Sequence, residues 1–170
     1  MRWLLTQGHQ VYGVELAEDA VRGYFEDAGE RFDVISGRYA YLDSYVGPGG
    51  VIYRGNLFDL TAPDLPGIQA VYDRAALVAL PLDLRARYAD HLLRIVPDGT
   101  RILLVTMEFE QSRVAGPPFA VPSDEVEMLF KDRCRVERLD SGNVYDPPPK
   151  FAVAGVEDAQ EVVWRITKQH

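Results

Sequence analysis

Short apolar runs alternate with amphipathic segments along most of this chain. The apolar runs predict buried strands over residues 10–16, 51–54, 69–73, 101–109, 134–139 and 162–166. Apolar positions that recur every three or four residues predict helices over residues 18–28, 84–95 and 121–130. Ser123 is expected to cap the last of these helices. Strands that alternate with helices are typical of an α/β fold, with a mostly parallel sheet and helices on both faces.

Two segments depart from this alternation. Residues 32–50 contain several tyrosines and a Gly-Pro-Gly-Gly turn, which predict a short hairpin insertion. Residues 1–9 have the pattern of the back half of a helix, and the strand that follows ends on Glu15. In nucleotide-binding folds such an acid ends the second strand, about 20 residues after a glycine-rich turn. We therefore expect the chain to begin inside its fold, without the first strand and that turn.

Polar residues come directly after several predicted strands, and they are the candidates for a functional site. They are Glu15, Asn56, Asp73, Arg74 and Glu108. Ligands of open α/β sheets bind beyond the carboxyl ends of the strands, so we expect these residues to converge on one rim. Glu15 equally fits a solvated carboxylate at the end of a strand. Asp73 and Arg74 by themselves fit a surface ion pair that caps the helix after them better than they fit a site.

The composition narrows the possible classes of function. A length of 170 residues with 47% apolar side chains predicts one domain that spans residues 1–170. A net charge of -8 argues against nucleic acid or an anionic membrane surface as the main partner. No apolar stretch approaches the ~18 to 20 residues of a membrane span and no signal peptide is evident, so we expect a soluble, cytoplasmic protein.

The residues that usually bind metals or attack substrates give weaker signals. Cys134 is the chain's one cysteine, so an internal disulfide is excluded. No histidine lies near it in sequence, which argues against a catalytic thiol. No set of His, Cys, Asp and Glu residues has the spacing of a metal site, so no metal is expected.

Four sequence strings, taken together, resemble a known family. They are Met1–Leu16 (MRWLLTQGHQVYGVEL), Phe58–Leu60 (FDL), Val71–Leu80 (VYDRAALVAL) and Gly116–Phe119 (GPPF). In order and spacing they are similar to the thiopurine S-methyltransferases, particularly the bacterial members, and the resemblance covers essentially the whole chain. It implies the class I, Rossmann-like methyltransferase fold and S-adenosylmethionine as the cofactor.

The resemblance also implies which residues bind this cofactor. Glu15 matches the acid that binds the ribose hydroxyls. Asn56 and Leu57 match the positions that flank the adenine. Arg74 matches an arginine at the place where cofactor and methyl acceptor meet, and it is the expected catalytic residue.

A further loop is implied to bind the methyl acceptor. Pro117, Pro118 and Phe119 match the loop that walls the acceptor pocket of the family. The implied acceptor is a small molecule with a soft nucleophile: a thiopurine, an aromatic thiol, or a related selenium or tellurium compound. Methyl transfer to such a nucleophile requires positioning more than a strong base.

The chain also departs from the family pattern. Family members carry roughly fifty more residues before the position of Met1, including the central first strand and its turn at the methionine end of the cofactor. Without that strand, the strands predicted at 10–16 and 69–73 are left with unpaired edges. The complete family members are expected to be monomers, whereas this chain is expected to self-associate through those edges.

Two other functions remain open at this point. The chain could be a non-catalytic remnant or binding module that keeps the later strands of the fold. It could also be a nicotinamide-dependent oxidoreductase, because an acid at the end of a second strand serves that cofactor equally well. The strings at 71–80 and 116–119 argue against the oxidoreductase.

Overall fold

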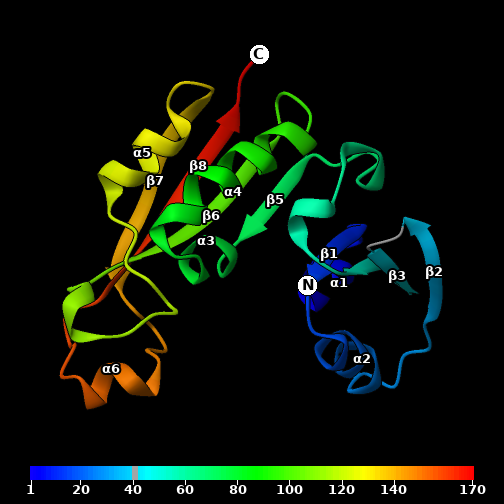
Figure 1. The fold of residues 1–170 in the computed structure, drawn as a ribbon, viewed down its shortest axis with the longest axis horizontal. Coiled ribbons are helices and arrows are strands. Elements are labelled where there is room, and N and C mark those ends of the chain that lie inside the picture. Colours follow the sequence, from blue (N-terminus) through cyan, green and yellow to red (C-terminus); the bar gives the residue numbers. More distant parts are fainter. Residues whose placement is uncertain (40–41) are drawn as a thin grey trace. The chain divides into compact units, whose positions relative to one another are not determined.

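The computed structural model describes residues 1–39 and 42–170, which form two compact units (Figure 1). We call Met1–Leu65 the N-terminal unit and Pro66–His170 the C-terminal unit. The N-terminal unit contains α1 (Arg2–Thr6), β1 (Val11–Glu15), α2 (Glu18–Glu26), β2 (Asp33–Tyr39), β3 (Leu42–Gly47), β4 (Gly50–Arg54) and the 3-10 turns η1 (Leu57–Asp59) and η2 (Ala62–Asp64). The C-terminal unit contains β5 (Ala70–Asp73), α3 (Ala76–Ala79), α4 (Leu82–Ile95), β6 (Arg101–Glu108), η3 (Gln111–Arg113), α5 (Ser123–Phe130), β7 (Cys134–Asn143), α6 (Pro149–Val153) and β8 (Gln160–Lys168).

The N-terminal unit is built on a four-stranded sheet in the order β1-β4-β3-β2. β1 and β4 are parallel, whereas β3 pairs antiparallel with both β4 and β2. The predicted hairpin insertion is therefore confirmed, although residues 40 and 41, including Tyr41, lie outside the described residues. α2 packs Val21 and Phe25 against Tyr45 and Ile52 of the sheet, which gives this unit its own apolar core.

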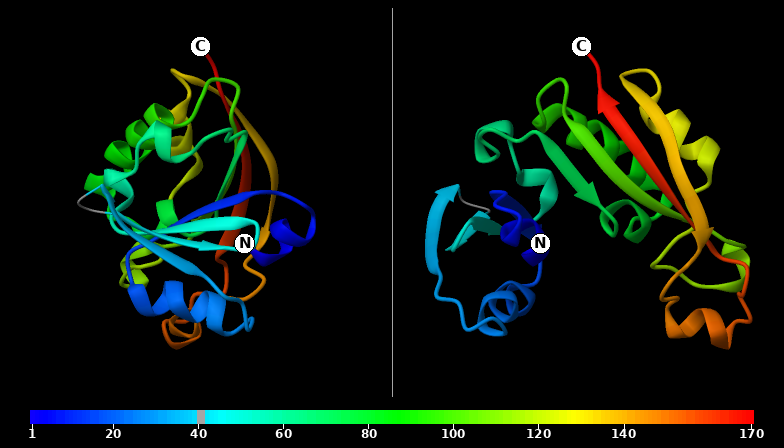
Figure 2. Two further views of the ribbon diagram at one scale, coloured as in Figure 1. Left: turned by 90° about the vertical axis from the view of Figure 1, so that its right-hand side faces the viewer. Right: turned by 180° about the vertical axis from the view of Figure 1, so that it is seen from behind.

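The C-terminal unit has a second four-stranded sheet in the order β5-β6-β8-β7. β5 and β6 are parallel, and β8 runs antiparallel between β6 and β7. Figures 1 and 2 show α4 and α5 on the same face of this sheet. Ile102 and Leu104 of β6, Leu93 of α4 and Val126 of α5 are almost fully buried in the core of this unit.

The sheets are more antiparallel than the sequence pattern predicts. Only β1–β4 and β5–β6 are parallel pairs within the described residues, because hairpin connections join β2, β3 and β4 and because β8 returns against both of its neighbours. Two short helices, α3 and α6, were not predicted, and neither is long enough to show a helical apolar period. The prediction that Ser123 caps α5 is wrong: Ser123 is the first helical residue, and its hydroxyl donates to Glu108 Oε1 at 2.5 Å.

β1 and β5 each lie at the edge of their own sheet. Within the described residues, β1 pairs with β4 alone and β5 pairs with β6 alone. The outer edge of each strand therefore presents backbone N–H and C=O groups without a ladder partner. These are the two strands for which the sequence predicts unpaired edges.

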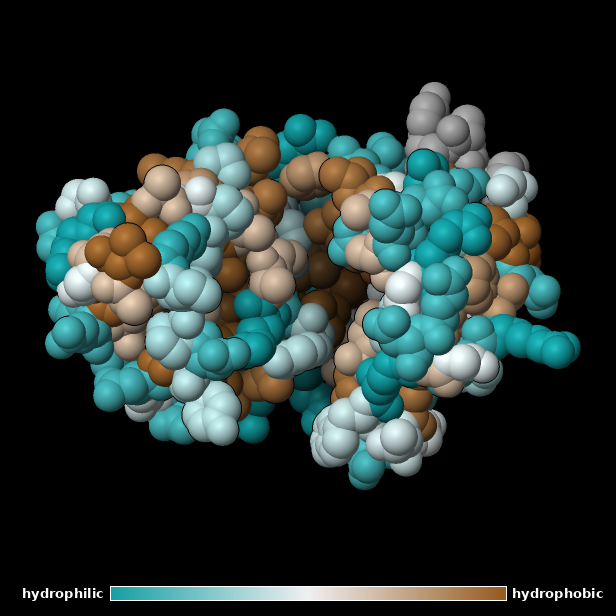
Figure 3. All heavy atoms as spheres, turned by 90° about the horizontal axis from the view of Figure 1, so that it is seen from below, coloured by the Kyte–Doolittle hydropathy of each residue, from teal (hydrophilic) through white to brown (hydrophobic). Residues whose placement is uncertain are grey.

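The surface of each unit is mixed in character. On the face seen in Figure 3, hydrophilic residues predominate on the outside and apolar residues appear between them. Tyr72 of β5 and Leu103 of β6 are 56% and 41% exposed, so large side chains on the sheet of the C-terminal unit reach the solvent. None of the helices in the described part of the chain is long and apolar enough to cross a membrane.

Cys134 begins β7 and is buried, with 4% of its surface exposed. Burial raises the pKa of its thiol, and the charges of Arg133 and Lys168 act in the opposite direction. Because the thiolate is the reactive form, we expect iodoacetamide to modify the native protein at least about a hundredfold more slowly than the unfolded protein. Mass spectrometry of timed samples measures both rates, and equal rates would mean that Cys134 is accessible in the native fold.

Candidate functional site

The predicted cofactor residues of the N-terminal unit lie at the carboxyl ends of two neighbouring strands. Glu15 ends β1 and Asn56 follows β4, which is its parallel neighbour. The two strand ends remain in contact, because the Gly55 amide donates to the Glu15 carbonyl oxygen at 2.9 Å. The sequence-based expectation that these two residues share a rim is therefore met within this unit.

Hydrogen bonds orient both side chains at this edge. Glu15 Oε1 accepts from the Ala17 amide at 2.8 Å, just before α2 begins. Asn56 Oδ1 accepts from the Phe58 amide at 3.1 Å and so starts the turn η1. Both side chains are exposed, and Leu57 beside them is half-buried. An exposed carboxylate next to an amide and an apolar side chain can hold a ribose diol and flank a base, so these residues fit the nucleoside part of a cofactor.

Asp73 ends β5 and is a structural residue of the C-terminal unit. Its Oδ1 accepts from the amides of Ala76 and Leu77 at 3.0 and 3.3 Å, and thus caps α3. Its Oδ2 accepts from the Tyr88 hydroxyl at 2.7 Å. Burial raises the pKa of Asp73, while these hydrogen bonds act against the rise. Both oxygens are committed to local structure, so Asp73 is not free to serve as a general base.

Arg74 forms an ion pair with a residue that is distant in sequence. Its Nη2 lies 3.1 Å from Glu161 Oε1 on β8, and its side chain is 49% exposed. The alternative in which Asp73 and Arg74 form an ion pair with each other is therefore wrong, although Asp73 does cap the following helix. Sequence reasoning missed Glu161, because 87 residues separate it from Arg74 and no local pattern connects the two.

Phe119 closes the loop Gly116–Phe119 and is held from several sides. The Phe119 amide donates to the Val78 carbonyl oxygen of α3 at 2.6 Å. A methyl group added at Gly116 would lie 2.3 Å from the Phe119 ring, so only glycine allows the ring to fold over the loop. The Arg85 guanidinium lies 5.8 Å from the centre of the same ring.

The arginine next to this ring belongs to a buried ion pair. Arg85 Nη1 lies 2.7 Å from Glu125 Oε2, and the two side chains are only 4% and 9% exposed. Arg85 Nε also donates to the Leu80 carbonyl oxygen at 2.9 Å, which fixes the start of α4. The pair thus joins α4 to α5 next to the Phe119 ring.

The short helix α3 brings the predicted residues of the C-terminal unit together. Arg74 lies just before α3, and Phe119 is hydrogen-bonded to it. The loop is fixed on its other side as well, because the Val121 amide donates to the Met107 carbonyl oxygen of β6 at 2.8 Å. Arg74 and the loop therefore occupy the carboxyl ends of β5 and β6, where ligands of α/β sheets bind.

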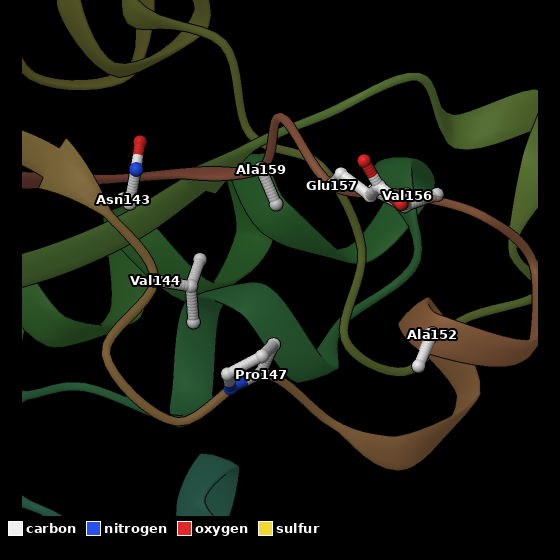
Figure 4. A pocket seen from close by; sticks show the side chains of 7 residues that line it. All are labelled: Asn143, Val144, Pro147, Ala152, Val156, Glu157 and Ala159. Carbon is white, nitrogen blue, oxygen red and sulfur yellow. The ribbon is translucent and has the colours of Figure 1, made fainter.

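A pocket of about 280 Å³ lies in the same unit, between the end of β7, α6 and the start of β8 (Figure 4). Its lining is mostly small and apolar, and Asn143 and Glu157 are the polar residues among the seven that Figure 4 labels. None of the sequence-predicted site residues lines it. Within the described residues, no group of three or more His, Cys, Asp and Glu side chains could hold a metal ion.

Solved structures share this fold at low sequence identity. A methyltransferase dependent on S-adenosylmethionine from Methanosarcina mazei superposes with a TM-score of 0.67 at 14% identity, over 99% of this chain and 87% of that one. An N1-methyltransferase of Burkholderia thailandensis, solved with 1,6-didemethyltoxoflavin and S-adenosylhomocysteine bound, has a TM-score of 0.59 at 16% identity, over 99% of this chain and 65% of that one. The Rossmann-like methyltransferase fold predicted from the sequence is confirmed.

Sequence relatives give a narrower assignment. A thiopurine S-methyltransferase of Bordetella petrii is 39% identical over 170 residues, which cover 99% of this chain and 76% of the relative. One of Pseudomonas fluorescens is 41% identical over 164 residues, which cover 96% of this chain and 74% of the relative. The family described as thiopurine S-methyltransferase (TPMT) matches residues 1–169, which span both units. This chain belongs to the thiopurine S-methyltransferase family.

Proposed function

We propose that this chain transfers the methyl group of S-adenosylmethionine to the sulfur of small thiols, with thiopurines and aromatic thiols as the acceptors. Family membership makes the chain a methyltransferase, and it argues against the nicotinamide-dependent oxidoreductase. One observation supports a thiol as the acceptor. The exposed guanidinium of Arg74 and the apolar loop of two prolines and Phe119 both lie at the carboxyl ends of β5 and β6.

The proposal also includes the residues that would bind the cofactor. Glu15 would hold the ribose hydroxyls, while Asn56 and Leu57 would flank the adenine. The position of Glu15 at the carboxyl end of a parallel strand supports this role, as does its exposed carboxylate. When bound, S-adenosylmethionine supplies an electrophilic methyl group on a sulfonium.

The residues of the C-terminal unit suit the acceptor side of this reaction. These residues would bind and orient the acceptor, whose sulfur would lose its proton to solvent and then take the methyl group in line, with S-adenosylhomocysteine as the leaving group. Arg74 would stabilise the thiolate form of the acceptor before the attack, because a nearby cation lowers the pKa of a thiol. Pro117, Pro118 and Phe119 would orient the aromatic ring and exclude water. No general base is needed, which agrees with the structural role of Asp73.

We also propose that both units belong to a single methyltransferase domain. One family description spans residues 1–169, and so includes the proposed cofactor residues of one unit and the acceptor residues of the other.

The expected partner is a small molecule in the cytoplasm. Selenium or tellurium nucleophiles, which are softer still than sulfur, are a further acceptor class that this chemistry allows.

The test is methyl transfer to 6-mercaptopurine by the native chain and by Arg74→Lys. Lysine keeps the charge but loses the planar fork, and with it any bidentate contact to the acceptor, so we expect turnover to fall by about tenfold or more. The thermal midpoint should stay nearly unchanged, because exposed ion pairs such as Arg74–Glu161 stabilise a fold by less than about 1 kcal/mol.

Other outcomes of this test have definite meanings. Equal losses of activity and of thermal midpoint would make Arg74 a structural residue. A native chain that neither binds S-adenosylmethionine nor transfers its methyl group would be a non-catalytic module of the same fold.

A further inference from the structure

The segment after β7 contains the short helix α6, which is anchored in the core of the C-terminal unit. Phe151 of α6 is fully buried, at 0% exposure. Its ring centre lies 4.8 Å from that of Phe109, which follows β6, and it packs with Val114 and Val156. α6 is therefore fixed against the chain that leads from β6 into the Gly116–Phe119 loop.

Lys150, the neighbour of this anchor, reaches the loop itself. Its Nζ donates to the carbonyl oxygen of Ala115 at 2.8 Å and also to that of Pro117. The residue as a whole is half-buried, and its two hydrogen bonds lie at the surface of the unit. Both hydrogen bonds are charge-assisted, and such bonds are roughly twice as strong as neutral ones.

A second cation links the chain before the loop to α6, with donor and acceptor segments reversed: here the donor precedes the loop and the acceptors follow α6. Arg113 Nη2, from the chain before the loop, donates to the carbonyl oxygen of Ala154 at 3.1 Å and also to that of Gly155. The start of α6 thus holds the loop, and the chain before the loop holds the end of α6. The two segments are joined at both ends by side chains that donate to backbone oxygens.

The two prolines limit how the backbone of the loop can be held. Pro117 and Pro118 have no N–H group, so neither can donate a backbone hydrogen bond. The loop must therefore be fixed through its carbonyl oxygens and through the amides that flank the prolines. Phe119 provides one such amide, bonded to Val78. Lys150 provides the donors for the carbonyl oxygens at the other end.

We propose that Lys150 is a positioning residue of the methyl-acceptor site. Its ammonium group fixes the carbonyl oxygens of Ala115 and Pro117, and thereby sets where Pro118 and Phe119 lie at the carboxyl ends of β5 and β6. It acts through the loop and does not need to touch the acceptor. This inference rests on the proposed function, in which Pro117, Pro118 and Phe119 wall the acceptor pocket.

Hydrogen exchange of the full chain tests whether Lys150 holds the loop, and it does not require the chain to be active. Lys150→Met keeps the length of the side chain but removes the donors and the charge. We expect the amides of Phe119, Ala120 and Val121 to exchange about tenfold faster in this variant, because each charged hydrogen bond contributes about a decade to local stability. Amides of α5 should be unaffected. Unchanged exchange at residues 119–121 would overturn the proposal.

Matched variants separate this role from general effects of losing a lysine. Lys131→Met removes an exposed lysine after α5, and it should leave exchange of the loop unchanged. Lys150→Arg keeps donors and charge, and it should restore most of the protection. If Lys131→Met loosened the loop as much as Lys150→Met does, the effect would come from net charge and the proposal would be overturned.

Steady-state kinetics with 6-mercaptopurine test the functional half. In Lys150→Met we expect the KM for the acceptor to rise about fivefold or more, while the KM for S-adenosylmethionine stays within a factor of two. Lys150→Arg should recover the acceptor KM. A looser loop with an unchanged acceptor KM would overturn the positioning role. A native chain without methyl transfer would instead refute the proposed function, and the exchange experiment would still decide whether Lys150 holds the loop.

Discussion

Replacing Glu15 by alanine is expected to weaken the affinity for S-adenosylmethionine by at least about tenfold. In the proposed site, the exposed carboxylate at the end of β1 would accept hydrogen bonds from two ribose hydroxyls, and each charge-assisted bond contributes about a decade of affinity. Titration calorimetry of the native protein and of Glu15→Ala measures the difference directly.

A matched control shows whether the effect belongs to this position. Glu26→Ala removes another exposed carboxylate of the N-terminal unit, at the end of α2, and it should leave the affinity unchanged. If Glu15→Ala bound the cofactor as tightly as the native protein, Glu15 would have no place in the site.

The largest loss of stability is expected for Glu125→Ala. Glu125 and Arg85 form a buried ion pair at 2.7 Å, so removal of the acid leaves the Arg85 guanidinium without its counter-charge. Breaking a buried pair by deleting one partner costs about 3 to 5 kcal/mol, because the remaining charge cannot return to water. Urea unfolding followed by circular dichroism should show this decrease in the free energy of unfolding.

The double variant Arg85→Met with Glu125→Leu distinguishes the cost of an orphaned charge from the worth of the pair. Replacing both charges with apolar side chains of similar size should recover most of the lost stability. A double variant as unstable as Glu125→Ala would mean that the pair itself, rather than the unpaired guanidinium, accounts for the stability.

The sequence predicts the long elements of this fold well, because their signals are local. The apolar run at 102–105 lies within β6, and the helical period at 84–95 falls within α4. The boundaries move by a few residues, since β7 extends to Asn143 although its outer half is exposed and has no apolar run. There the strand is held by its pairing with β8, which a local pattern cannot reveal.

The candidate site is predictable only in part, for the same reason. Glu15 and Asn56 are recognised by their places at the ends of predicted strands. The partners that hold the other side chains are distant in sequence. Glu161 is 87 residues from Arg74, and Lys150 is 33 residues from Pro117. Such contacts arise from the topology of the sheet, so only the folded structure reveals them.

The place of β8 in its sheet affects the order in which the C-terminal unit can fold. β8 follows both β6 and β7 in the chain, yet it lies between them. During synthesis on the ribosome, β6 and β7 emerge before the strand that joins them exists. Until β8 has been made, β6 keeps one open edge and β7 has no partner within the sheet, a state that favours binding by chaperones or by other nascent chains. Closure of this sheet must therefore wait for the synthesis of β8.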